Sequence, residues 1–329
     1  MVGGPTLSPL KLRYLGGWTR PVRTPFNFLY TMWKPSHFFT GLEIHTREST
    51  WRTFREGNAI FGARIRMSGA RSVRIDVWRD HSANESEISS LLDRICTSYG
   101  FQDDLSNHFK LVRANGHARP FKKVLHSRIS CPESLFEITV ISVLLQNTTV
   151  SRSTQMLKSL LVEAGSIVEF DGVRLRAFFT PDGLRQIGQR TLRDVCRVGY
   201  RARTLEAVGE YFCRSEPCGQ LSPDVLERLL DIRGIGPYSL GVIASAALRD
   251  PRAISLDVWN TQIVAMLFDL DGRTVNRDEV RNCLSAQYPE VEGLTLLYAT
   301  ESACIATPLD PLADSVSDAR RKSHKQLGD

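Results

Sequence analysis

The chain has no long apolar run. Nowhere in its 329 residues do roughly 18 or more apolar residues follow one another, the length that a membrane-spanning helix needs. Residues 1–30 also lack an uninterrupted apolar segment followed by a cleavage site, so we expect no secretory signal. With 42% hydrophobic residues the chain can still bury a substantial core. We therefore expect a globular intracellular protein with no membrane contact, in the cytoplasm or nucleoid of a bacterium or archaeon or in the nucleus of a eukaryote.

Cysteine is sparse and scattered. The odd number of cysteines argues for reduced thiols in a reducing compartment. Cys213 and Cys218 are the closest two, and no second pair or histidine couple completes a zinc set around them. We expect no metal site. The seven positions are Cys96, Cys131, Cys196, Cys213, Cys218, Cys283 and Cys304.

Acidic residues are scarce near the N-terminus. Residues 1–80 contain 13 Lys and Arg against 5 Asp and Glu, and the rest of the chain contains 29 against 31. The net charge of +6 therefore comes from the N-terminal part. Such a basic region is compatible with phosphate contacts and salt-sensitive binding, although basic surfaces also serve solubility.

The periodicity of apolar residues changes near residue 82. Before it, residues 59–66 and 72–78 alternate apolar and polar side chains, as antiparallel strands do. After it, helical spacing dominates: residues 86–99 predict an amphipathic helix and residues 135–145 a buried one. We expect an α+β protein with a small antiparallel β-rich domain at 1–82, a mostly helical core at 83–306 and a flexible tail at 307–329.

Within the helical core, the segment from Leu229 to Leu240 predicts a helix-hairpin-helix over residues 223–247. The run Arg233-Gly-Ile-Gly236 breaks the first helix, because glycines allow the positive φ values of a tight turn. Pro237 suits the first position of the second helix, where its missing N–H costs nothing. Bare glycines at Gly234 and Gly236 would let a phosphate approach the hairpin N–H groups and the positive end of the second helix. The alternative is an ordinary pair of core helices.

Asp257 follows Tyr238 by 19 positions and precedes another apolar helix. On its own it is a reasonable N-cap, and most such aspartates do nothing else. Together with the hairpin, it resembles the DNA glycosylases of the endonuclease III superfamily, the helix-hairpin-helix (HhH-GPD) family, in which a catalytic Asp begins a later helix. The likeness is strongest over residues 133–270.

The β-rich N-terminal domain resembles one branch of that family, which contains the AlkA-type alkyladenine glycosylases and the 8-oxoguanine glycosylases. This part of the likeness rests on the strand pattern and on residues 25–28 and 34–38. Some relatives bind an iron–sulfur cluster through four cysteines after the catalytic Asp. Only Cys283 and Cys304 follow Asp257, so we expect no cluster.

Two further segments resemble DNA-contacting parts of these enzymes. The loop at Gln146 and Asn147 corresponds to one from which a side chain, here Gln146, fills the gap in the duplex when a nucleotide is flipped out. Without the family, it would be a polar connection between helices. Arg201 and Arg203 lie in a glycine-aromatic-basic stretch where phosphate contacts are expected, but they could equally be solvated. The expected DNA-binding set is Gln146, Asn147, Arg201, Arg203, Arg233, Gly234, Ile235 and Gly236.

The residue at position 238 bears on the reaction. Glycosylases that also cleave the strand have a Lys there, whose amine forms a Schiff base. Tyr238 cannot form an imine, so the resemblance implies a monofunctional enzyme that leaves an abasic site. We expect Tyr238 to form the base pocket and Asp257 to stabilise the positive charge that develops at C1′. Trp259 is a second candidate for the pocket, and its alternative is a place in the helix core.

The sequence thus predicts a monofunctional base-excision DNA glycosylase, acting as a monomer on double-stranded DNA with a damaged or mismatched base, and alkylated purine is the preferred substrate hypothesis. One alternative is a bifunctional glycosylase/lyase, which needs another amine at the site. The other is a non-catalytic helix-hairpin-helix protein in which Asp257 is only an N-cap. No cofactor is expected; a monovalent cation at the hairpin, as relatives can hold, leaves no sequence signature.

Overall fold

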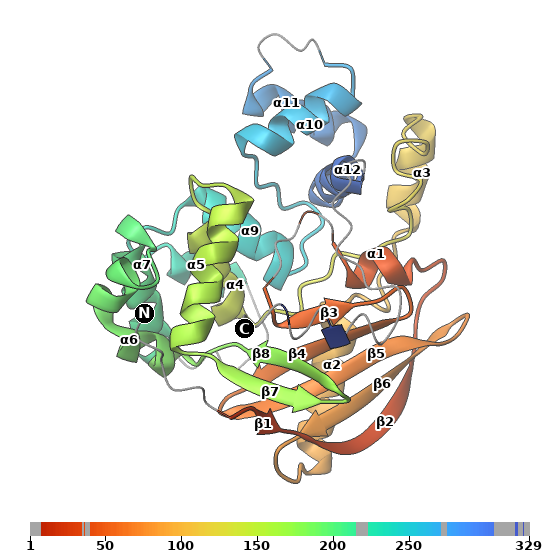
Figure 1. Ribbon diagram of the computed structural model, residues 1–329. Helices are drawn as coiled ribbons and strands as arrows, with labels where there is room; N and C mark the ends of the chain where they lie inside the picture. Colours follow the sequence, from red (N-terminus) through yellow and green to blue (C-terminus); the bar gives the residue numbers. More distant parts are fainter. Residues whose placement is uncertain are drawn as a thin grey trace.

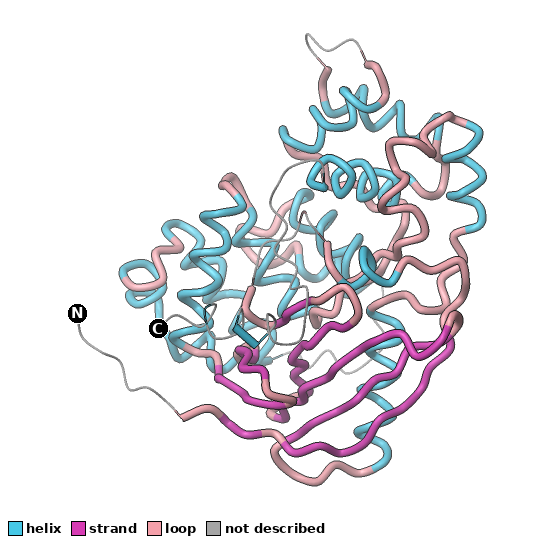
Figure 2. The backbone as a smooth tube through the Cα atoms, turned by 45° about the vertical axis from the view of Figure 1, so that its right-hand side comes forward, coloured by secondary structure: helices cyan, strands magenta, loops and turns pink. Residues whose placement is uncertain are grey.

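The computed structural model describes residues 8–34, 36, 40–214, 223–270, 275–305, 320, 321 and 325. Strands gather at one end of the molecule and helices fill the rest (Figures 1 and 2). The predicted α+β class is confirmed. Apart from three residues, the predicted tail from Thr307 lies outside the described residues. No helix in the described ranges is long and apolar enough to cross a membrane.

A five-stranded antiparallel sheet forms the lower part of the molecule in Figure 1. Its strands, in the order β2-β6-β5-β4-β3, are β2 (Arg13–Pro21), β3 (Glu43–His45), β4 (Ser49–Glu56), β5 (Ala59–Gly69) and β6 (Ser72–Arg79). The alternation in residues 59–66 and 72–78 correctly predicted β5 and β6. The two strands pair so that Ile65 lies opposite Ile75, and both side chains are fully buried.

Helix α2 (Glu85–Ser98) covers this sheet, and its prediction is also confirmed. It starts with a capping box in which the side chains of Asn84 and Glu87 each bond the other residue's backbone N–H. Its buried Leu91, Leu92 and Ile95 pack against the apolar face of the sheet. The sheet and α2 thus share one core.

A second, three-stranded sheet joins the two halves of the chain. It consists of β1 (Leu10–Lys11), β7 (Ser166–Phe170) and β8 (Val173–Ala177), and β1 pairs in parallel with β7. Strands β7 and β8 were not predicted from the sequence, although Asp171-Gly172 is a typical two-residue hairpin turn. Both have positive φ, 48° and 73°, as that turn requires.

Two groups of helices stand on the sheets, each with its own apolar core. The first contains α4 (Leu135–Leu145), α5 (Val150–Glu163), α6 (Pro181–Asp194), α7 (Ala202–Arg214), α8 (Pro223–Leu229) and α9 (Pro237–Ala247). The predicted buried helix is confirmed as α4, in which every residue from Leu135 to Leu144 is buried.

The second group lies higher in Figure 1, on the side of α3. It contains α3 (Ser106–Ala114), α10 (Val258–Leu267), α11 (Arg277–Gln287) and α12 (Glu292–Ile305), and the short α1 (Phe28–Met32) lies below it. Tyr288, Leu294 and Tyr298 are fully buried in its core. Because α9 belongs to the first group and α10 to the second, the segment between them crosses from one to the other.

Candidate functional site

The predicted helix-hairpin-helix is present as α8, a turn and α9. Gly234 has φ of +101°, and a Cβ at this position would lie 2.2 Å from Thr204 Oγ1 on α7. Gly236, the N-cap of α9, instead has an extended backbone with φ of −127°. A Cβ at Gly236 would meet no atom within 4 Å, and no side chain caps this end of α9. The two glycines therefore differ in use: Gly234 shapes the turn, while Gly236 leaves open space before helix N–H groups.

Asp257 is the N-cap of α10. Its Oδ1 accepts the Asn260 backbone N–H at 2.8 Å, and the Asn260 side chain accepts the Asp257 N–H at the same distance. Within the described residues, no group donates a hydrogen bond to Oδ2. The carboxylate is held in place by one oxygen and leaves the other available.

A cavity of about 250 Å³ lies between the two helical groups. It is lined by residues of α4, α5, α9, α10 and α12, by the segments 129–133 and 253–257, and by Lys34, Ser36, Thr40 and Glu43. Asp257, Tyr238 and Trp259 all belong to its lining, as the sequence analysis required of a base pocket. Its size is near the lower end for small-molecule sites and suits one flat ring system better than a larger ligand.

Tyr238 and Trp259 lie where the cavity meets solvent. Tyr238 is half-buried, and burial together with the nearby Asp257 carboxylate raises the pKa of its hydroxyl. Trp259 is 47% exposed, so it is not part of a helix core. An exposed aromatic ring at the mouth of a cavity can stack on a base.

Gln146 and Asn147 follow the C-terminus of α4. The Gln146 side-chain amide donates to the carbonyl oxygen of Gly234 at 2.8 Å and to Ser239 Oγ at 2.9 Å. Its amide thus links the α4–α5 loop to the hairpin. Asn147 is exposed and has φ of +45°. Unlike that of Gln146, its side chain makes no hydrogen bond to the described residues of the hairpin.

The three arginines of the expected DNA-binding set differ in exposure. Arg203 and Arg233 are exposed, whereas Arg201 is 7% exposed and donates to the Gln146 carbonyl oxygen. The solvated alternative for Arg201 is therefore wrong, because its guanidinium supports the loop from behind, and its phosphate contact stays a prediction. Ile235 is also buried, and its N–H is bonded to the Ile232 carbonyl oxygen at 2.9 Å, so it serves the shape of the hairpin.

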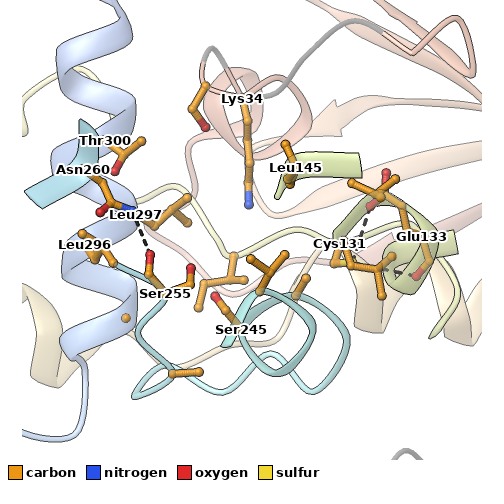
Figure 3. Close-up of a pocket in the computed structure, with 18 of the residues that line it drawn as sticks. Lys34, Cys131, Glu133, Leu145, Ser245, Ser255, Asn260, Leu296, Leu297 and Thr300 are labelled. Carbon is orange, nitrogen blue, oxygen red and sulfur yellow. Dashed lines mark hydrogen bonds between the residues drawn. The ribbon is translucent and has the colours of Figure 1, made fainter. Parts of the chain in front are cut away.

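The inner end of the cavity around Lys34, called its floor below, was not predicted from the sequence. Lys34 is 6% exposed and points into the middle of the cavity (Figure 3). Its ammonium donates to the Ser130 carbonyl oxygen at 2.9 Å. Burial lowers the pKa of Lys34 to about 8, against the opposing attraction of Glu301. In the sequence, Lys34 stood out only as the first residue of the segment 34–38, which resembles the glycosylases.

Acidic side chains surround this floor, but each already has a partner. Glu301 on α12 accepts hydrogen bonds from the Ser36 N–H at 3.0 Å and from its hydroxyl at 2.5 Å. Glu43 and Glu133 both bond to the buried Arg52. Although burial acts to raise the pKa of Glu43, Arg52 and His45 together hold it well below its usual range.

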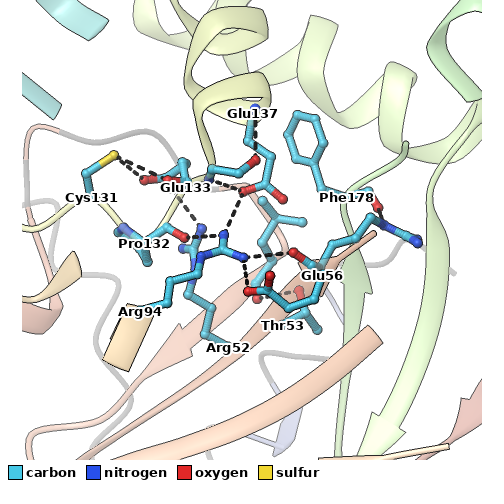
Figure 4. Close-up of polar contacts among 12 residues, drawn as sticks. Arg52, Thr53, Glu56, Arg94, Cys131, Pro132, Glu133, Glu137 and Phe178 are labelled. Atoms are coloured by element: carbon cyan, nitrogen blue, oxygen red, sulfur yellow. Dashed lines mark hydrogen bonds and ion pairs between the residues drawn. The ribbon is translucent and has the colours of Figure 1, made fainter. Parts of the chain in front are cut away.

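The Arg52 cluster ties the sheet to the start of α4 (Figure 4). Arg52 lies on β4, and its second nitrogen bonds Glu133 at 2.8 Å. Cys131, also in the cavity lining, donates its thiol proton to Glu133 Oε2 at 3.4 Å. Burial raises the pKa of Cys131 well above its ordinary value, so the thiol is protonated and unreactive at neutral pH.

Among the described residues, no three His, Cys, Asp or Glu side chains form a group that could hold a metal ion. The expectation that the chain needs no metal or cofactor stays a prediction. A cation at the hairpin would be bound by backbone carbonyls, so the side chains found there neither support nor oppose such a site.

No protein-family profile matches this chain. Its sequence is similar to a probable N-glycosylase/DNA lyase of Methanothermobacter thermautotrophicus, 23% identical over 207 residues. That match spans 56% of this chain and 66% of the archaeal protein, just under two thirds of its length.

Solved structures resemble the chain over more of its length. A 3-methyladenine DNA-glycosylase from Archaeoglobus fulgidus superposes with a TM-score of 0.73 and 15% identity, over 86% of this chain and 97% of that one. An 8-oxoguanine glycosylase/lyase from Clostridium acetobutylicum, solved with double-stranded DNA containing 8-oxoguanine, gives a TM-score of 0.56 and 17% identity, over 82% and 99%. The chain therefore has the fold of the helix-hairpin-helix DNA glycosylases, as the sequence predicted.

Proposed function

We propose that this chain, which has the fold of the helix-hairpin-helix DNA glycosylases, is a monofunctional DNA N-glycosylase. It would flip a damaged base into the cavity and hydrolyse the bond between the base and C1′, leaving an abasic site. The observation that carries the proposal is the position of Asp257: a fixed carboxylate with one unbonded oxygen, at the mouth of a base-sized cavity and next to the hairpin.

The hairpin would hold the DNA backbone during this reaction. The open space at Gly236 and the N–H groups at the start of α9 form a surface that suits a phosphate oxygen. Exposed Arg203 and Arg233 would add charge to this contact. The α4–α5 loop would enter the duplex, through Gln146 as predicted or through the exposed Asn147 beside it.

Asp257 would act on the sugar. As the base leaves, C1′ gains positive charge, and an ionised carboxylate in a site shielded from water stabilises it. The second oxygen can also orient the attacking water. Tyr238 would pack on the base or sugar beside it, and it offers no amine for a Schiff base, which supports a monofunctional reaction.

The test is a single-turnover assay on duplexes that contain alkylated purine, 8-oxoguanine, uracil or a mismatch, with and without alkali. Strand breaks that appear only after alkali, and disappear in Asp257→Asn, are the expected result. Alkylated purine, our substrate hypothesis from the sequence, is one member of this panel. No base release from any duplex, with DNA binding intact, would favour the non-catalytic alternative.

One observation favours a second candidate, the bifunctional glycosylase/lyase. The cavity does contain an amine, Lys34, although at its floor rather than at the hairpin. Breaks without alkali, together with a borohydride-trapped covalent adduct that Lys34→Met abolishes, would establish this reaction instead.

A further inference from the structure

Lys34 is a buried cation with unused hydrogen-bonding capacity. An ammonium has three donors, and among the described residues only the Ser130 carbonyl oxygen accepts from Lys34. Its burial leaves it little access to bulk water. Buried polar donors without partners are costly, and proteins keep them where a ligand supplies the acceptor.

The nearby carboxylates do not neutralise Lys34 by direct contact. In the described part of the chain, no Asp or Glu oxygen lies within ion-pair distance of its ammonium. Glu301 is engaged by Ser36, and Glu133 and Glu43 are engaged by Arg52. These groups provide a general negative field that keeps Lys34 mostly protonated at neutral pH, and the Lys34 side chain points into the cavity (Figure 3).

Apart from Asp257, the described wall of the cavity offers few free partners to a positively charged base, since Glu43 and Glu133 are engaged by Arg52. Cations bind well against the faces of aromatic rings, and among the described residues the aromatic members of the lining are Tyr238 and Trp259. The described lining also contains aliphatic side chains, those of Ile129, Ile138, Ile141, Val242, Ala246 and Leu296. In such surroundings the charge of Lys34 acts on a bound base with little screening.

We infer that Lys34 is the residue that selects the base: it donates to acceptor atoms on the edge of an uncharged damaged base and repels bases that already carry a positive charge. The inference rests on the proposed glycosylase function. A Lys paired with a carbonyl oxygen and ring nitrogen of a purine is a common base contact. The substrate class is then an uncharged purine with a carbonyl oxygen, such as hypoxanthine or 8-oxoguanine, and positively charged alkylated purines are disfavoured.

The experiment measures single-turnover base release from duplexes that differ only in the lesion: hypoxanthine and 8-oxoguanine as uncharged bases, 7-methylguanine and 3-methyladenine as charged ones. Because charged bases leave more easily by themselves, the readout is the change in the uncharged-to-charged rate ratio between wild type and Lys34→Met. We expect this ratio to fall about tenfold or more, the discrimination typical of one good base contact. Lys110→Met, on the exposed face of α3, is the matched control and should leave the ratio unchanged.

If wild type releases only uncharged bases, the inference requires Lys34→Met to lose at least tenfold in rate while still binding the duplex. If circular dichroism shows that Lys34→Met is unfolded, Lys34→Gln, which can keep the bond to Ser130, takes its place. Lys34→Gln should release charged bases faster than wild type does.

Three results would overturn the inference: release of charged bases alone by wild type, an equal loss on all lesions in both variants, or a borohydride adduct on Lys34. Release of no base at all from any duplex by wild type is a different outcome, because it removes the proposed function itself.

Discussion

The mouth and the floor of the cavity are built in different ways. The mouth comes from one continuous stretch, the hairpin and Asp257, in which backbone geometry and a single N-cap do most of the positioning. The floor combines Lys34, Ser130 and Glu301, which come from three distant parts of the chain and meet only in the fold. In the proposed reaction, the chemistry would depend on a local motif, while the choice of substrate would depend on tertiary packing.

The largest expected effect tests the support behind the floor. Arg52→Met removes the buried partner that Glu43 and Glu133 share and leaves these two partly buried carboxylates without their ion pairs to it, which should cost about 3–5 kcal/mol of unfolding free energy. Urea unfolding measures it. The control is Arg190→Met, whose exposed pair with Asp194 should contribute less than about 1 kcal/mol. Equal losses of unfolding free energy in Arg52→Met and Arg190→Met would contradict the idea that burial makes the Arg52 ion pairs more important for stability.

The next effect tests the mouth. Asp257→Asn should reduce single-turnover base release about 10²- to 10³-fold, because the charge is lost at C1′ while the cap on α10 is retained. Thermal unfolding should therefore change little. Asn84→Ala, which removes the cap of α2 far from the cavity, should show the reverse: about 1 kcal/mol of lost stability with base release intact.

A smaller effect separates the two hairpin glycines. Gly236→Ala fits the free protein, so its stability should change by less than about 1 kcal/mol, yet the new methyl group would occupy the proposed phosphate site and weaken DNA binding about tenfold. Gly234→Ala forces a side chain onto a positive φ and into Thr204, so it should lower stability first. Fluorescence anisotropy and unfolding curves on both variants distinguish the cases. Unchanged DNA affinity in Gly236→Ala would argue against the phosphate site.

The smallest effect is a pH dependence at the floor. With a pKa of about 8, Lys34 is mainly charged at pH 7 and mainly neutral at pH 9. Release of an uncharged base should therefore fall by less than about tenfold as pH rises through 8, since one donor and the charge are lost. The charged or titratable groups around it are Glu301 on α12, Cys131 and Glu133 before α4, Arg249 after α9, Glu43 on β3 and Asp257 on α10. Lys34→Met should abolish the decline, and a decline that persists would assign it to another group.

The sequence predicted the mouth because its signals are local. Glycines, a proline and a capping aspartate each set the backbone within a few residues of their own positions. The local sequence is therefore enough to predict the turn and the helix starts that they form. The strands β5 and β6 and the helices α2 and α4 were predicted for the same reason.

The floor could not be predicted in this way. A lysine is usually exposed, and nothing in the residues around Lys34 indicates that α12 will supply Glu301 nearby. Arg201 was misjudged on the same grounds, since only the fold shows that the Gln146 carbonyl oxygen accepts from its guanidinium. The β7–β8 hairpin differs, because its Asp171-Gly172 signal was present and local but stood inside a region of helical periodicity.

The pairing of β1 with β7 has a consequence for how the chain is made. Leu10 lies opposite Val168, so the first strand has no partner until more than half of the protein has been synthesised. Phe170 then packs against Gly62, where even a methyl group would come within 2.7 Å of its ring. The three-stranded sheet therefore cannot form until the chain has been made as far as β8, whereas every strand of the five-stranded sheet is made earlier.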